Sequence, residues 1–85
     1  MMTTDVAELR NLGPKSARLL KEAGISTLEE LRELGAIAAY KRLQFQFGKQ
    51  VSLNFLWAMA AGLENRDWRD LSQDEKARLR AGLET

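Results

Sequence analysis

The residues best suited to do chemistry lie in the stretch Leu9–Ile25, which reads LRNLGPKSARLLKEAGI. Its apolar spacing and its Gly-Pro pair predict two short helices joined by a three-residue turn, with the turn opening the second helix. The first turn of a helix leaves backbone N–H groups without partners, at the positive end of the helix dipole. Such a turn can hold a phosphate, so we expect any contact with nucleic acid to be made here.

Other chemistries are excluded by residue type and position. The chain has no Cys and no His, which removes thiol chemistry, disulfides, ordinary zinc sites and the usual acid–base side chain. Carboxylate pairs such as Glu29 and Glu30 stand at predicted helix starts, where capping accounts for them. Lys15 and Ser16 are adjacent on a helix and point about 100° apart, which argues against a catalytic dyad. We therefore predict no enzyme activity, no metal site and no cofactor.

The predicted hairpin spans residues 5–24. Asp5 and Glu8 form a plausible capping pair for the first helix, and Asn11 and Gly13 end it because both residues tolerate positive φ. The proline that follows suits the first position of the second helix, which Gly24 then stops.

The remainder of the chain also reads as helix. Two overlapping capping boxes begin a third helix: Ser26 with Glu29, and Thr27 with Glu30. A further capping box, Ser72 with Glu75, begins the last helix. Between them, residues 36–45 have helical spacing and residues 51–63 are apolar on nearly every side, which indicates a helix that is central or covered by a partner. No alternating pattern of useful length occurs. We predict an all-α fold of five or six short helices.

Large apolar residues give two further expectations. Trp57 and Trp68 sit among leucines and are expected in the core. Some of the phenylalanines are hard to accommodate in so small a core and, with a methionine, are expected to form an exposed patch that pairs with another subunit or a protein partner. The residues assigned to this surface are Phe47, Phe55 and Met59, beside Phe45.

Length and charge limit the functions available. Eighty-five residues predict a single domain, 1–85. A net charge of +1 and a pI near 8.1 predict weak affinity for nucleic acid. A second basic group, made of Lys41, Arg42 and Lys49, is more typical of a solvated helix face. The N-terminus lacks a basic region followed by an apolar run, and no segment is long enough to span a membrane, so we expect a cytoplasmic protein.

Three blocks of sequence resemble a known family. The hairpin block, Leu9-x-x-Leu12-Gly-Pro-Lys-Ser-Ala-x-x-Leu20, resembles the helix-hairpin-helix element of DNA polymerases, ligases and repair proteins, and the helical C-terminal domain of the bacterial RNA polymerase alpha subunit. Together with Val51–Trp57 and Arg66–Ser72, it is similar to the C-terminal domain of the TfoX (Sxy) family of natural-competence regulators. The similarity extends from about Val6 to Leu79. It implies an orthogonal helical bundle of the helix-hairpin-helix or SAM-like type.

The resemblance also implies roles for individual residues. The usual turn is Gly-hydrophobic-Gly, and Asn11 replaces the first glycine, a change that keeps the left-handed conformation accessible. The nucleic-acid site implied by the resemblance consists of Asn11, Gly13, Lys15, Ser16 and Arg18. The N–H groups near Gly13, Lys15 and Ser16 would face a phosphate, with the Ser16 hydroxyl as an extra donor, and Lys15 and Arg18 would flank it. Binding to DNA would be largely independent of sequence and sensitive to salt.

Two alternatives remain open for the hairpin surface. In the first, the hairpin is purely structural: Leu12 plugs the gap between the helices and Ala17 lets them approach. In the second, the domain docks a protein of the transcription or competence apparatus, or dimerises, without touching DNA.

Overall fold

The computed structural model describes residues 4–84, and these residues are all-α, as predicted. Within them no strand occurs, and a single isolated antiparallel bridge joins Asp5 to Thr27. These residues form five α-helices and three short 3-10 turns. Their order is η1 (Val6–Glu8), α1 (Pro14–Glu22), α2 (Leu28–Leu34), α3 (Ala36–Phe47), η2 (Gly48–Gln50), α4 (Leu53–Leu63), η3 (Trp68–Asp70) and α5 (Gln73–Gly82).

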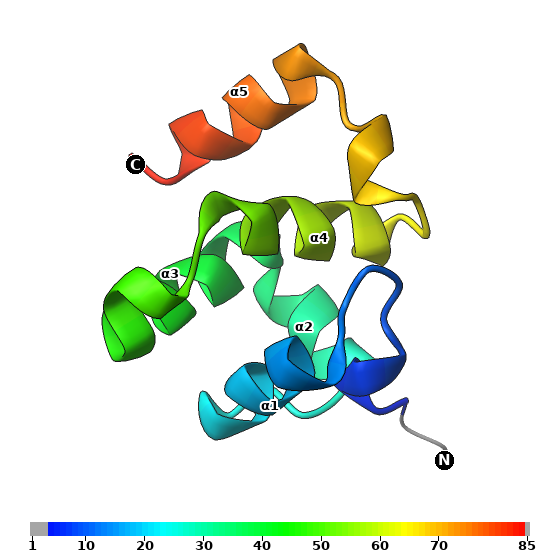
Figure 1. Ribbon diagram of the computed structural model, residues 1–85, viewed down its shortest axis with the longest axis vertical. Helices are drawn as coiled ribbons and strands as arrows, with labels where there is room; N and C mark the ends of the chain where they lie inside the picture. Colours follow the sequence, from blue (N-terminus) through cyan, green and yellow to red (C-terminus); the bar gives the residue numbers. More distant parts are fainter. Residues whose placement is uncertain (1–3, 85) are drawn as a thin grey trace.

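The helix α4 is the centre of the fold. Figure 1 shows it crossing the middle of the molecule, with α1, α2 and α3 on one side and α5 on the other. Seven of its eleven residues are buried, namely Phe55, Leu56, Trp57, Ala58, Met59, Ala61 and Gly62. The near-continuous apolar run that predicted a central helix is therefore covered by elements of the same chain.

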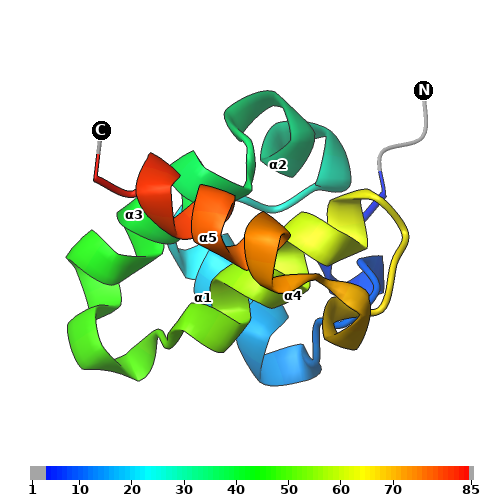
Figure 2. The ribbon, with the colours of Figure 1, turned by 90° about the horizontal axis from the view of Figure 1, so that it is seen from above.

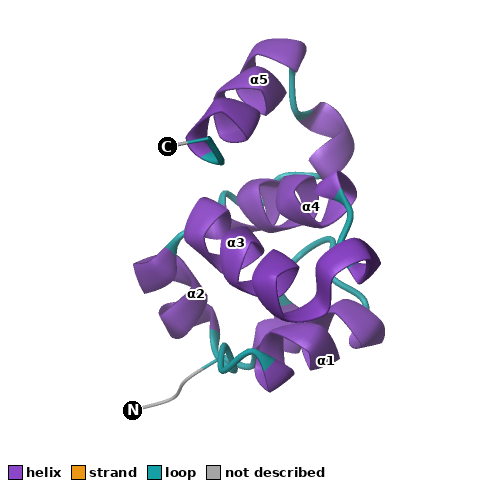
Figure 3. Cartoon of the chain, turned by 90° about the vertical axis from the view of Figure 1, so that its left-hand side faces the viewer, coloured by secondary structure: helices purple, strands orange, loops and turns teal. Residues whose placement is uncertain are grey.

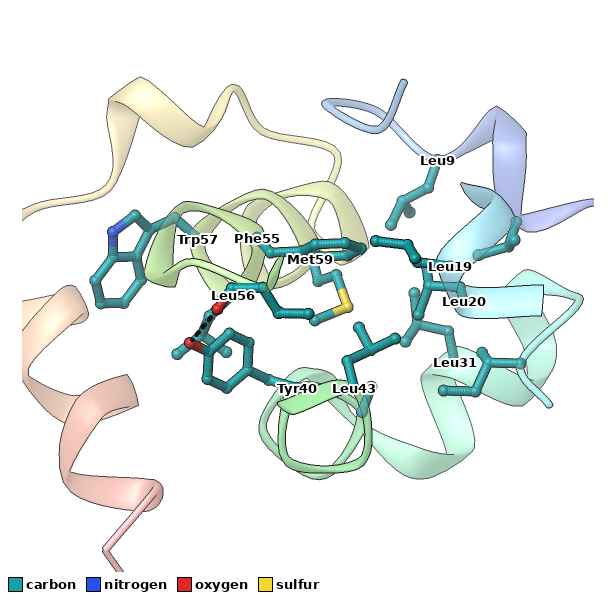
Figure 4. Close-up of a cluster of buried hydrophobic side chains, with 14 of the residues drawn as sticks. Leu9, Leu19, Leu20, Leu31, Tyr40, Leu43, Phe55, Leu56, Trp57 and Met59 are labelled. Atoms are coloured by element: carbon teal, nitrogen blue, oxygen red, sulfur yellow. Dashed lines mark hydrogen bonds between the residues drawn. The ribbon is translucent and has the colours of Figure 1, made fainter. Parts of the chain in front are cut away.

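The core forms where leucines of three helices meet α4. Leu20 of α1, Leu31 of α2 and Leu43 of α3 are fully buried and converge on α4, as the close-up in Figure 4 shows. Tyr40 closes the other end of this cluster, where its hydroxyl donates to the carbonyl oxygen of Val51 at 3.4 Å. Removal of this much apolar surface from water is the main term that stabilises the domain.

The first arm of the hairpin is shorter than predicted. It is one 3-10 turn, and the Asp5 carboxylate caps it by accepting from the N–H of Ala7 at 2.8 Å. The turn cannot extend toward the N-terminus because the preceding backbone is extended and pairs with the loop before α2. In that pairing the N–H of Val6 donates to Ser26 O at 2.9 Å, and the N–H of Leu28 donates to Thr4 O at 2.8 Å.

Local start and stop signals set most of the other helix ends. The capping boxes that form pair Thr27 with Glu30 and Ser72 with Glu75. The overlapping box predicted for Ser26 and Glu29 does not form, since Glu29 Oε1 accepts from the N–H of Thr4 instead, at 3.2 Å. Gly35, at φ 86°, ends α2 and begins α3 in a conformation that L side chains rarely adopt.

The helix α5 is attached along one side only. Figure 3 shows it lying beyond α4, away from α1 and α2. None of its residues is fully buried. Leu79 and the C-cap residue Leu83 are partly buried against the core. Lys76 lies over the ring of Trp57, with the ammonium 5.8 Å from the ring centroid. Among the described residues α5 therefore covers α4 without contributing to the innermost core.

Candidate nucleic-acid interface

The hairpin turn has the predicted sharp bend. Asn11 adopts φ 79°, in the left-handed region, as the sequence predicts. Gly13 does not share the positive φ expected of it: at φ −92° it is extended and precedes Pro14 as the N-cap of α1. The backbone N–H groups of Lys15 and Ser16 donate to no acceptor within residues 4–84, so these donors at the start of α1 are open.

The side chain of Asn11 is directed into the fold. Its Nδ2 donates to the carbonyl oxygens of Ala58 at 3.3 Å and Arg66 at 2.9 Å. Its Oδ1 accepts from the backbone N–H of Trp68 at 3.3 Å. Asn11 therefore ties the turn to α4 and to the segment before η3. Within the predicted nucleic-acid site Asn11 therefore positions the turn, because both of its side-chain polar atoms are engaged inside the domain.

A shallow cavity of about 330 Å³ lies beside the turn. We call it the hairpin groove. Its lining comes from the first turn of α1, from the start of α4 and from η3, and consists of Asn11, Lys15, Ser16, Leu19, Gln50, Ser52, Asn54, Phe55, Ala58 and Trp68. Figure 2 shows the start of α1 and the start of α4 along the same edge of the molecule. Lys15 and Ser16 thus meet in the groove, whereas Gly13 and Arg18 do not line it and remain exposed nearby.

A second helix start lines the groove, which the sequence analysis missed. Ser52 is the N-cap of α4, yet its side chain makes no capping hydrogen bond. The N–H groups of Leu53 and Asn54 likewise have no acceptor in the described part of the chain. The Ser-Leu-Asn segment was a local signal for this helix start, but its position opposite α1 depends on the tertiary fold. Two positive dipole ends therefore border one cavity.

The groove belongs to a part of the chain that lacks carboxylates. Residues 9–21 contain four cations and no Asp or Glu, and residues 34–63 contain three cations and no Asp or Glu. Lys21 pairs with Asp5 at 2.9 Å, and Arg10 donates to Asn65 O at 3.0 Å. Of the cations in these two stretches, Lys15, Arg18 and Lys49 have no such partner among the described residues.

The second basic group does not form one cluster with a single role. Arg42 donates to the carbonyl oxygen of Ala23 at 3.5 Å and so covers the C-terminal end of α1. Lys49, in η2, is exposed and adjoins Gln50, which lines the hairpin groove. The two residues therefore lie at opposite ends of α1, and Lys49 alone is placed to extend the basic surface of the groove.

The segment after α4 is held in place by an ion-pair cluster. The Arg66 guanidinium binds the carboxylates of Glu75 and Glu64, and its NH2 donates to the carbonyl oxygen of Asp70 at 3.0 Å. Hydrogen bonding from Arg66, followed by the backbone N–H of Ser72, lowers the pKa of Glu75 from 4.5 to about 2. The cluster joins the start of α5 to η3 and so fixes the wall of the groove.

Trp57 and Trp68 differ in environment. Trp57 is buried, which confirms its predicted core position. The same prediction is wrong for Trp68, which keeps 36% of its surface exposed and lines the hairpin groove. Trp68 begins the 3-10 turn η3, and its backbone N–H donates to Asn11 Oδ1.

Most of the residues predicted to form an exposed apolar docking surface are buried or half-buried. Met59 is fully buried and Phe55 is buried beside it, because α4 is surrounded by its own chain. Phe47 is half-buried against the core. The exposed aromatic is Phe45 on α3, which is 95% exposed. The helical spacing of these residues indicated two apolar faces, but it did not show which face the rest of the chain would cover.

The described residues offer little for other kinds of ligand site. No group of three or more Asp, Glu, His or Cys side chains among residues 4–84 is arranged to hold a metal ion. No helix in that range is both long and apolar enough to cross a membrane.

The sequence matches known proteins along nearly its whole length. It fits the family described as the TfoX C-terminal domain over residues 2–83. It is 39% identical over 72 residues to the DNA transformation protein TfoX of Haemophilus influenzae, a match covering 85% of this chain and 33% of that protein. It is 26% identical over 72 residues to the DNA transformation protein TfoX1 of Aliivibrio fischeri, covering 85% of this chain and 34% of that protein. The chain thus spans about a third of the length of these relatives.

The fold also matches a solved structure. The crystal structure of an uncharacterized protein from Listeria monocytogenes superimposes with a TM-score of 0.83 at 27% identity, covering 91% of this chain and 86% of that one. The three blocks that carried the sequence resemblance meet at the hairpin groove, where Asn11 of the first block bonds to the third and residues of the second line the wall. The chain belongs to the TfoX C-terminal domain family.

Proposed function

We propose that this domain is a non-enzymatic binding module that contacts the DNA backbone through the hairpin groove, without reading base sequence. The observation that carries the proposal is the set of free donors in and beside the groove. The side chains of Lys15, which lines the groove, and Arg18, which is exposed nearby, have no ion-pair partner in residues 4–84, and the N–H groups of Lys15 and Ser16 have no acceptor there. A phosphate meets N–H donors, a hydroxyl and positive charge in one place.

The names of related proteins also support a function that involves DNA. Two relatives are named DNA transformation proteins, and the domain is homologous to competence regulators. We extend this to a role in transcription or competence regulation in which the domain supplies backbone contacts. A DNA partner in a bacterium implies a cytoplasmic location. The net charge of +1 implies that the isolated domain binds weakly.

A titration with duplex DNA tests the proposal. Fluorescence anisotropy of a labelled 20-base-pair duplex at about 20 mM salt, where screening is weakest, should detect binding that falls steeply at physiological salt. The double variant Lys15→Glu with Arg18→Glu should abolish it. The matched control is Arg32→Glu with Arg80→Glu, which changes the net charge by the same amount on exposed residues of α2 and α5. The control should retain binding, because the proposal assigns the affinity to the charge beside the groove and not to the net charge. Absence of binding at low salt would refute the proposal.

A specific observation favours a second function, protein docking or self-association. Phe45 is 95% exposed on α3, with Phe47 half-buried two residues later. Large exposed aromatics are enriched at protein interfaces. Under this alternative, Phe45→Ser would convert a dimer to a monomer in sedimentation experiments at high protein concentration. A parent domain that sediments as a monomer at such concentrations would remove the dimer.

A further inference from the structure

The exposed tryptophan of the hairpin groove is not needed to contact a phosphate backbone. Trp68 keeps 36% of its surface exposed and lines the same cavity as Lys15. A flat aromatic beside a cation is the combination with which proteins hold unpaired nucleotides, because the base stacks on the ring and the cation meets the phosphate. The paired bases of a duplex are stacked on each other and do not offer a free face.

The polar lining suits the edges of a nucleotide. Gln50 and Asn54 carry amides with both donors and acceptors, and Ser16 and Ser52 carry hydroxyls. No hydrogen bond to another described residue engages these four side chains. The floor is apolar, from Leu19, Phe55 and Ala58. A volume of about 330 Å³ lies at the lower end of the range for small-ligand pockets, which is the scale of a single nucleotide unit.

Charge gives the groove a direction. The α1 side carries Lys15, whereas Trp68 is flanked in the sequence by Asp67 and, two residues later, by Asp70. Asp67 is neutralised by Arg69, whose NH2 is 2.9 Å from Asp67 Oδ2. Asp70 has no ion pair within the described residues and disfavours a phosphate at the Trp68 side. The backbone of a bound strand is therefore directed toward α1 and its base toward the ring.

The backbone that carries the ring is held before any ligand arrives. The backbone N–H of Trp68 donates to Asn11 Oδ1, and the Arg66 guanidinium donates to the carbonyl oxygen of Asp70 at the end of the same 3-10 turn. An aromatic platform whose backbone is fixed loses less conformational freedom on binding. From these observations we infer that the hairpin groove prefers single-stranded over duplex DNA, with one base stacked on Trp68 and its phosphate on Lys15. This inference rests on the proposed function.

Two labelled ligands of equal length distinguish the outcomes: a 20-nucleotide oligo-dT strand and a 20-base-pair duplex, titrated at about 20 mM salt. We expect tighter binding of the single strand. Trp68→Ala should weaken single-strand binding about 5- to 150-fold, the loss of one stacked base, and weaken duplex binding much less. Trp68→Phe keeps an aromatic face and should retain most of the affinity. Phe45→Ala removes an exposed aromatic outside the groove and is the matched control.

Intrinsic fluorescence gives an independent readout. Trp57 is buried, so quenching by oligo-dT reports on Trp68. The quenching should disappear in Trp68→Phe while anisotropy still detects binding. Equal affinity for both ligands, or unchanged single-strand binding by a folded Trp68→Ala variant, would overturn the inference and leave backbone binding intact. If neither ligand binds, the proposed function falls as well.

Discussion

Asn11 combines two properties that no other residue type supplies together. It accepts a left-handed backbone at φ 79°, and its amide makes three hydrogen bonds to backbone groups 47 to 57 residues away. Glycine would satisfy the first requirement alone. The asparagine in place of a turn glycine is thus a connection between the hairpin and the groove wall.

Two substitutions separate these properties. Asn11→Gly keeps the backbone conformation and loses the side-chain bonds, and we expect it to lower the free energy of unfolding by about 1–3 kcal/mol. Asn11→Ala loses the same bonds and keeps a Cβ in the left-handed region without the polar side chain that makes asparagine tolerant there, so we expect it to be less stable than Asn11→Gly by roughly 1–2 kcal/mol. Urea denaturation measures both. If the alanine variant were no less stable than the glycine variant, the left-handed backbone at position 11 would not contribute to the cost of substitution, and this prediction would be wrong.

Glu75 predicts how stability depends on pH. Its pKa in the folded domain is about 2, below the ordinary 4.5, because Arg66 binds the carboxylate. The stabilisation is therefore fully present above about pH 4.5 and is lost as the pH falls toward 2. Glu75→Gln removes the charge but can still complete the capping box with Ser72.

We expect the parent domain to be more stable than Glu75→Gln at neutral pH, and the difference to shrink between about pH 5 and pH 2. Chemical denaturation across that range measures it. A difference that stays constant with pH would show that the ion pair with Arg66 does not control the titration.

At the scale of elements, the close approach between the hairpin and α4 depends on Gly62. A Cβ at this position would lie 2.5 Å from the carbonyl oxygen of Arg10 and 2.9 Å from Leu9 Cγ. Backbone cannot move aside as a flexible side chain can. We therefore expect Gly62→Ala to destabilise the domain by roughly 1–3 kcal/mol.

Gly13→Ala is the matched control for that variant. Nothing lies within 4 Å of a Cβ at Gly13, and its φ of −92° is open to any residue. Its cost is limited to the weaker N-cap, below about 1 kcal/mol. Thermal unfolding compares the two variants, with a shift of about 4–8 °C per kcal/mol for a domain of this size. Equal shifts would contradict the steric account.

The element boundaries show what local sequence can predict. Pro14 begins α1, Gly35 separates α2 from α3, and the Ser72 box begins α5, because each signal acts within a few residues. The first arm was predicted too long, since its backbone pairs with the loop near Ser26, and no local pattern reports that pairing. Helix starts are local, whereas the partners of an extended segment are not.

The candidate site divides in the same way. The open donors of Lys15 and Ser16 follow from the turn, and they were predicted. The approach of α4 to α1, the inward direction of Asn11 and the exposure of Trp68 all depend on contacts between distant segments. The prediction that Met59 lies in an exposed patch was wrong for a related reason. When a helix is apolar on every side, its sequence does not show which faces the rest of the chain covers.

For the whole molecule, the salt dependence of DNA binding is limited by the small number of unpaired cations near the hairpin groove. If Lys15, Arg18 and Lys49 each neutralise one phosphate, log K should fall with log salt with a slope no steeper than about −2.7. Lys15→Ala should reduce that slope by about 0.9, whereas Arg32→Ala on α2 should leave it unchanged. Anisotropy titrations at several salt concentrations measure the slope. A value that Lys15→Ala does not alter would place the contact elsewhere.

The bond between Asn11 and Trp68 also has a consequence for biosynthesis. Its two ends are 57 residues apart, and a ribosome that adds about 5–20 residues per second needs about 3 to 11 seconds to make the intervening chain. Until Ala58 is made, 47 residues after Asn11, the turn has none of its side-chain partners, although α1 and α2 have been translated by then. The nascent polypeptide must therefore complete its ligand-facing cavity last, once most of the domain has been made.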